Sequence, residues 1–257
     1  MTANVWGDYF QNPVDVREGA FIDAFARYRP DIIGLQEMTP GWYDGKMFSS
    51  LQDGYAITGA VLGSHVNYVP LAYDKARFDL LESGFQRYSK TPDRSKGITY
   101  AVLQAKENRQ VFAVCNTHFW WKSGPEHDRI RHLNATELIL CMRRLKQVYS
   151  CPVFAFGDLN CTIADEVFQV FNASNIVRLH DIAQSACPLS SHHADPTPGA
   201  DGLYHGHRTD NPQSLSIDHI LGLFGAQPCD VSAYELVLDQ PVLDASDHSP
   251  VYADIDV

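Results

Sequence analysis

The chain has 257 residues, enough for one large domain or two small ones. Its 45% hydrophobic and 20% charged residues are typical of soluble globular proteins, and no run approaches the ~18 apolar residues that a membrane span needs. The formal net charge of -11 disfavours a surface that grips long nucleic acid through its phosphates, and composition therefore favours a small substrate.

The start of the chain and its cysteines bear on location. No basic segment leads into an apolar one at the N-terminus, and Met1 runs straight into an expected strand, so either the protein begins abruptly or a leader has been removed. No Cys-x-x-Cys spacing occurs, and several cysteines stand in apolar runs, which predicts reduced, buried thiols in a cytoplasmic protein. The six cysteines are Cys115, Cys141, Cys151, Cys161, Cys187 and Cys229.

Apolar periodicity predicts many strands and a few helices. Expected strands are Thr2–Trp6, Asp31–Leu35, Val66–Tyr73 paired with Phe78–Leu81, Ile98–Gln104 paired with Val111–Asn116, Val153–Phe156, Ser216–Leu221 and Val251–Ile255. Expected helices are Val16–Arg29, Arg129–Tyr149 and about 165–172. The second helix should bury a side formed by Ile130, Leu133, Leu138, Ile139, Met142 and Leu145. Residues 188–212 form a long loop, and without a repeat or a composition break we expect a single domain over 1–257.

The stretch 153–160 is the centre of the interpretation. The apolar run Val153–Phe156 is followed by Gly157, and then by an acid and an amide two positions apart. Side chains two apart on an extended segment point the same way, so Asp158 and Asn160 should share one face at the end of a strand.

Polar side chains recur where the other apolar strands end. They are Asn4, Glu37, His118, Asp218, Asp247 and His248. Converging carboxylates repel each other, so their convergence would require a cation between them. Oxygen ligands without a nearby thiolate suit a hard ion such as Mg²⁺ or Mn²⁺.

At this point the sequence resembles the metal-dependent endonuclease/exonuclease/phosphatase superfamily, which is DNase I-like. Six short motifs appear in the family's order across nearly the whole chain: Asn4-Val5, Leu35-Gln36-Glu37, Asn116-Thr117-His118, Gly157-Asp158-Leu159-Asn160, Ile217-Asp218-His219-Ile220 and Ser246-Asp247-His248-Ser249-Pro250-Val251. The resemblance implies an α+β fold, a four-layer α/β/β/α sandwich of two mostly antiparallel sheets.

The resemblance also implies roles for the strand-end residues. Glu37 is then the main metal ligand, helped by Asn4 and by Asp247 directly or through water. Asp158 orients or deprotonates the attacking water, and Asn160 holds the phosphate. His248 bonds the phosphoryl oxygens with Asp218 orienting it, while His118 contacts the phosphate or assists the leaving oxygen.

Several residues keep two interpretations. His118 is a site histidine or a satisfied structural one, and Trp120 and Trp121 are a stacking surface for a sugar or base or a packed loop anchor. Arg94, with Ser95 and Lys96, brings positive charge to a phosphate or lies in a solvated loop. The resemblance implies that His205 lines the pocket. The group His192, His193, Asp195, His205 and His207 invites a zinc interpretation that its Pro-rich setting disfavours. Arg131 is expected to form a salt bridge within the fold.

The favoured function is a divalent-metal-dependent phosphoric ester hydrolase for a small phosphorylated substrate, attacking phosphorus with water. The alternative is an endo- or exonuclease, which the lack of a Lys/Arg cluster disfavours. A lipid phosphodiesterase ranks third because no hydrophobic docking loop stands out, and no membrane partner is expected. A non-enzymatic binding module ranks last because no catalytic position is lost.

Overall fold

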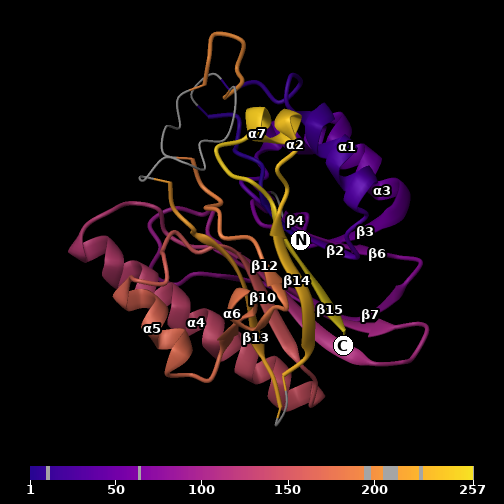
Figure 1. The fold of residues 1–257 in the computed structure, drawn as a ribbon, viewed down its shortest axis with the longest axis vertical. Helices are drawn as coiled ribbons and strands as arrows, with labels where there is room; N and C mark the ends of the chain where they lie inside the picture. Colours follow the sequence, from indigo (N-terminus) through magenta and orange to yellow (C-terminus); the bar gives the residue numbers. More distant parts are fainter. Residues whose placement is uncertain (10–11, 63–64, 194–197, 205–213, 226–227, 257) are drawn as a thin grey trace.

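The computed structural model describes residues 1–9, 12–62, 65–193, 198–204, 214–225 and 228–256. Two sheets lie face to face, with helices on both outer sides (Figure 1). The seven-stranded sheet has the order β12 (Ser185–Ala186), β14 (Asp230–Leu236), β15 (Val251–Asp256), β1 (Thr2–Asn4), β2 (Ile32–Gln36), β6 (Leu71–Asp74), β3 (Tyr55–Thr58). The six-stranded sheet has the order β11 (Val177–Arg178), β13 (Asp218–Leu223), β10 (Val153–Asp158), β9 (Val111–His118), β8 (Gly97–Ala105), β7 (Phe78–Arg87).

Most neighbouring strands are antiparallel, and the parallel pairs are β1–β2, β9–β10 and β12–β14. A separate hairpin joins β4 (Val61–Leu62) to β5 (His65–Val66). The expected α+β fold with two mostly antiparallel sheets is therefore confirmed. Within the described ranges, no helix combines the length and the apolar character required to cross a bilayer.

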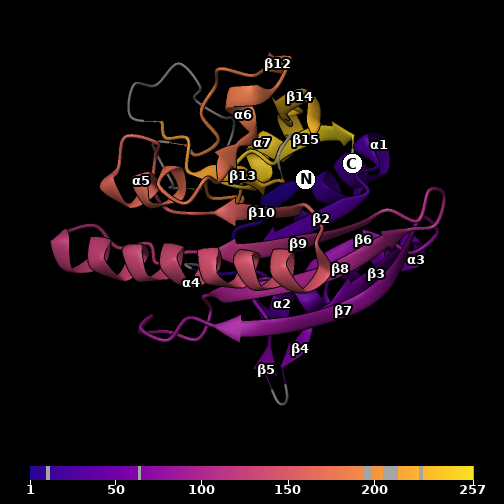
Figure 2. The same ribbon diagram turned by 90° about the horizontal axis from the view of Figure 1, so that it is seen from below.

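Helices cover the two outer faces and complete four layers. The seven-stranded sheet carries α1 (Glu18–Tyr28), α2 (Pro40–Asp44), α3 (Lys46–Gly54) and α7 (Gln240–Ala245). The six-stranded sheet carries α4 (Pro125–Tyr149) and α5 (Glu166–Asn172), and α6 (Leu179–Ile182) lies against β14. Figure 2 shows α4 running along the strands of its sheet.

Strand alternation explains the layers. In β10, Val153 and Ala155 pack under α4 and α5, whereas Phe154 and Phe156 enter the core between the sheets. Since successive side chains point to opposite faces, Asp158 falls on the inter-sheet side, at the end of the strand. The alternation thus directs a carboxylate into the space between the sheets.

Two details of the predicted elements are wrong. Val66–Tyr73 and Phe78–Leu81 do not pair with each other, because β6 pairs with β2 and β3 whereas β7 pairs with β8 in the other sheet. Leu133 is 42% exposed, because α4 instead turns Arg131 and Asn134 inward, beside Ala135 and Leu138. The elements that were not expected from the sequence are α2, α3, β3, β4, β11, α6, β12, β14 and α7.

Candidate active site

Three strands of the six-stranded sheet bring three polar residues into one row. The parallel pairing of β9 and β10 places Asp158 opposite His118, and the antiparallel pairing of β10 and β13 places it opposite Asp218. The first strand of the other sheet, β1, contributes Asn4 across the gap. The centre therefore lies where the two sheets meet at one end.

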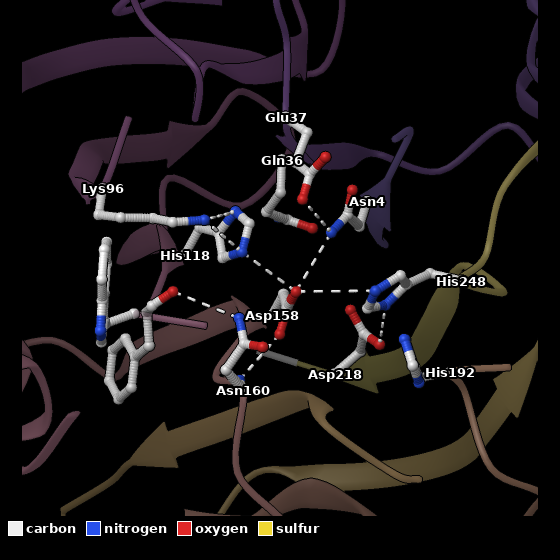
Figure 3. Close-up of polar contacts among 12 residues, drawn as sticks. Asn4, Gln36, Glu37, Lys96, His118, Asp158, Asn160, His192, Asp218 and His248 are labelled. Atoms are coloured by element: carbon white, nitrogen blue, oxygen red, sulfur yellow. Dashed lines mark hydrogen bonds and ion pairs between the residues drawn. The ribbon is translucent and has the colours of Figure 1, made fainter. Parts of the chain in front are cut away.

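The Asp158 carboxylate is the hub of this centre and is only 2% exposed (Figure 3). Asn4 Nδ2 donates to its Oδ2 at 3.1 Å, and His118 Nε2 lies 3.2 Å from the same oxygen. His248 Nε2 lies 3.8 Å from it, and the backbone N–H of Asn160 donates to Oδ1 at 2.8 Å. Burial alone would raise the pKa of Asp158, but the positive charges of His118, His248 and Lys96 hold it well below its usual range. The carboxylate is therefore ionised at neutral pH.

His248 is oriented by a carboxylate on its other side. Its Nδ1 lies 2.8 Å from Asp218 Oδ2, which also accepts a hydrogen bond from Ser191 Oγ at 2.6 Å. Burial lowers the pKa of His248, but the charges of Asp218, Asp247 and Asp158 outweigh it and raise this pKa well above its usual value. The imidazole therefore carries a proton and presents Nε2 to the centre.

Glu37 and Asp247 add two more carboxylates. Glu37 adopts a positive φ of 60° directly after β2, and its Oε2 accepts from the Gly7 N–H at 3.0 Å. Burial, together with the negative charges of Glu37 and Asp158, raises the pKa of Asp247 to about 7 despite the opposing charge of His248. Too little positive charge surrounds the Asp247 carboxylate, and a bound cation would supply it.

The donor chemistry fits a divalent cation. The carboxylate oxygens of Glu37 and Asp247 are the ligand types of a hard ion, whereas Asn4 turns Nδ2 to the centre and its Oδ1 accepts from the Trp6 N–H at 3.0 Å. Among the described residues, two groups bring three ligand atoms within 4.8 Å of one another. One is Asp158, Asp218 and His248, and the other is His192, Asp247 and His248. Glu37 stands in neither group.

Of the group Arg94, Ser95 and Lys96, which the sequence offered either as positive charge for a phosphate or as a solvated loop, Lys96 lies in the site. It is 4% exposed, and its Nζ lies 2.7 Å from His118 Nε2 and 3.0 Å from Nδ1. The antiparallel pairing of Ile98 with Thr117 brings the start of β8 beside the end of β9. Burial lowers the pKa of Lys96, and the charges of Glu37 and Asp158 oppose that shift. Only the register of β8 on β9 shows that Lys96 is buried beside His118.

The loop after His118 is held by α4. Arg131 donates to Trp120 O at 3.1 Å and pairs with Asp128, as expected of a bridging residue. Asn134 Oδ1 accepts from the Trp120 backbone N–H at 3.1 Å. These contacts hold the backbone at Trp120, just after the site residue His118.

The expected substrate-binding residues lie in different environments. Trp120 is 4% exposed and donates from Nε1 to His127 Nδ1 at 2.9 Å, which matches a packed anchor. Trp121 is 57% exposed. Arg94 is exposed, and its Nη1 lies 3.3 Å from His65 Nε2 rather than against the Asp158 centre. His205, with His207 and Asp195, lies outside the described residues.

The four layers with this centre at one end of the sheets make up the DNase I-like fold. A sequence model described as the Endonuclease/Exonuclease/phosphatase family matches residues 1–248, and the chain belongs to that family. The family hydrolyses phosphate esters and phosphodiesters and generally depends on a divalent metal ion. No curated protein matches the chain significantly.

Solved structures resemble the chain over its full length. An endonuclease/exonuclease/phosphatase from Bacteroides vulgatus is 20% identical with a TM-score of 0.78, covering 100% of this chain and 97% of that one. A Bacteroides thetaiotaomicron mannosyl-6-phosphatase is 17% identical with a TM-score of 0.75, covering 100% and 98%. TDP2 from D. rerio, complexed with single-strand DNA product, is 17% identical with a TM-score of 0.73, covering 100% and 97%. At these identities the likeness concerns the fold.

Proposed function

We propose that the chain is a phosphoric ester hydrolase that acts on a small phosphorylated substrate and uses Mg²⁺ or Mn²⁺. The observation that carries this proposal is the ionised, buried Asp158 carboxylate placed between His118 and His248. A carboxylate that can orient a water and cationic side chains that can contact a phosphoryl oxygen then lie within a few ångströms of each other. We further propose that residues 1–257 form one domain. We also propose that the protein is cytoplasmic, because all six cysteines are free.

Glu37 and Asp247 would hold the ion, and Asn4 would join them through Oδ1 once its amide is turned over. When bound, it neutralises charge on the phosphoryl group and makes a water more acidic. The raised pKa of Asp247 supports this assignment, because a carboxylate next to other carboxylates gains most from a cation.

The remaining roles belong to the chain's own side chains. Asp158 orients the attacking water by accepting its hydrogen bond, a role that suits a carboxylate with a low pKa better than that of a strong base. Protonated His248, held by Asp218, donates from Nε2 to a phosphoryl oxygen as charge builds there. Lys96 adds positive charge on the opposite side of Asp158, where it contacts His118, and Asn160 holds the phosphate.

Two observations bear on the substrate. The net charge of -11 and the similarity to a structure named a mannosyl-6-phosphatase support a small phosphorylated substrate. The alternative, a nuclease, is favoured by the exposed ring of Trp121, over which Lys122 Nζ lies 5.5 Å from the ring centroid. Such a pair can stack on a base and contact a phosphate.

Hydrolysis of p-nitrophenyl phosphate against bis-p-nitrophenyl phosphate tests the proposal, with Mg²⁺, with Mn²⁺ and with chelator. Metal-dependent cleavage of the monoester supports a phosphatase, and a phosphosugar panel follows. Cleavage of the diester leads to oligonucleotides, with Trp121→Ala as the variant that should lose activity on single strands only. Hydrolysis that persists in chelator and in Asp158→Asn would contradict the proposal.

A further inference from the structure

The segment 191–193 is fixed against the end of the candidate site by its backbone. The His193 N–H donates to Asp247 O at 2.8 Å, and the Ser249 N–H donates to Ser191 O at 2.7 Å. These bonds make His192 and His248 an antiparallel bridge. On its other side, His192 exchanges backbone hydrogen bonds with Leu215, at 2.9 and 3.2 Å. The position of His192 is therefore set by the fold.

This bridge places a second imidazole beside the candidate site. His192 Nε2 lies 4.0 Å from Asp247 Oδ2, and His248 Nε2 lies 4.0 Å from Asp247 Oδ1. The two rings meet edge to face with centroids 4.7 Å apart, and Figure 3 shows His192 next to His248 and Asp218. Two bonds of ~2.1 Å span about 3.4 Å in a tetrahedral site, and the three ligand atoms lie within 4.8 Å of one another. Side-chain rotations that move each ligand atom by up to about 1 Å would therefore bring all three onto one ion.

The surroundings of His248 suit a metal ligand. Asp218 Oδ2 contacts Nδ1, and Ser191 Oγ fixes Asp218 in turn. A metal-bound histidine usually donates its other ring N–H to a carboxylate in this way, which fixes the ring and directs the second nitrogen to the ion.

We propose that His192, Asp247 and His248 form a binding site for a transition-metal ion of the Zn²⁺ type, and that its occupation inhibits hydrolysis. Two imidazoles and one carboxylate select Zn²⁺ over Mg²⁺, which prefers oxygen ligands and water. Inhibition follows because an ion on His248 Nε2 takes the position of the proton that this nitrogen donates to the phosphoryl oxygen. Only the inhibition rests on the proposed function; the binding does not.

Zinc binding to the metal-free protein tests the site directly. The wild type, His192→Gln and His132→Gln are titrated with Zn²⁺ against a chromogenic chelator, His132 being an exposed histidine of α4. We expect His192→Gln to bind Zn²⁺ at least about tenfold more weakly, the lower limit for losing even an outer-sphere partner, with His132→Gln unchanged. Equal affinity in all three proteins would overturn the proposal.

A second measurement does not depend on the variants. Crystals of the wild type soaked in Zn²⁺ should give an anomalous peak in contact with His192, Asp247 and His248. A peak elsewhere, with none at these residues, would overturn the assignment even if His192→Gln fails to fold.

Inhibition is measured in the Mg²⁺-supported reaction, with each protein normalised to its own zinc-free rate. The Zn²⁺ concentration for half inhibition should rise at least about tenfold in His192→Gln relative to the wild type. Zinc binding without inhibition would refute the inhibitory role. A protein that hydrolyses no substrate at all would refute the proposed function, whereas the zinc titration would still decide the site.

Discussion

Gly157 offers a direct test of how the strands position the site. Its φ is +148°, and a Cβ built there would lie 1.9 Å from the carbonyl oxygen of Thr117 on β9. Gly157 pairs with Thr117, and the next pair along the two strands is Asp158 with His118. A methyl group at position 157 would therefore push apart the two strands whose ends carry the site.

The size of the effect follows from this contact. Real Cβ atoms essentially never approach closer than 3.0 Å, so the strands must separate by about 1.1 Å or more in Gly157→Ala. The strained backbone costs about 1–3 kcal/mol and the overpacking about 1–3 kcal/mol more. Displacement of catalytic groups by about 1 Å costs about 10²-fold in rate, so kcat should fall about a hundredfold.

Urea denaturation and the rate with p-nitrophenyl phosphate measure both effects, and Gly19→Ala is the matched control. Gly19 is the second residue of α1 with no atom within 4 Å of an added Cβ, so its replacement should leave the rate unchanged and stabilise the protein by at most about 0.5–1 kcal/mol. If Gly157→Ala kept its stability within about 0.5 kcal/mol and its rate within about threefold, the β9–β10 pairing would not be what holds Asp158 against His118.

Three further predictions follow from the site. Asp158→Asn should lose about 10²–10⁴-fold in kcat while circular dichroism shows a folded protein, because the group that orients the water loses its charge. Asp218→Asn should lower the pKa of His248, so the alkaline limb of the pH–rate profile moves to lower pH, and Ser191→Ala, which keeps the charge, should move it less. Calorimetric Mg²⁺ affinity should fall about tenfold from pH 8 to pH 6, because protons compete for Asp247, whose pKa is about 7, and Asp247→Asn should lose this dependence.

The placement of polar residues at strand ends was readable in the sequence because it depends on local pattern. The end of an apolar run marks the end of a strand, and the two-residue alternation places Asp158 on the inner face. Which strands are neighbours is a long-range property that such patterns do not contain. The row His118, Asp158, Asp218 depends on two sheet registers, and only the motif order pointed to it.

The errors and omissions share that cause. The short connection after β6 has the length of a hairpin, yet the chain there passes from one sheet to the other, since each strand finds its partners elsewhere. Lys96 stands among charged neighbours that give no sign of burial, and only the pairing of β8 with β9 buries it. His192 lies in a Pro-rich stretch without periodicity, and its backbone partners are about 20 and 55 residues away.

The two motifs Leu35-Gln36-Glu37 and Asn116-Thr117-His118 have a shared logic that the structure exposes. Gln36 Nε2 donates to Asn116 Oδ1 at 2.6 Å, and Asn116 Nδ2 donates to the carbonyl oxygens of Leu35 and Pro70, each at 2.7 Å. These buried amides join the sheets directly below the site, and breaking such a network leaves polar groups unsatisfied at a cost of about 1–3 kcal/mol each. Glu37 and His118 follow within two residues of these hydrogen-bonded amides. The amides therefore hold Glu37 and His118 close to each other by holding the two sheets together. Each motif therefore combines one residue that joins the sheets with one that faces the centre.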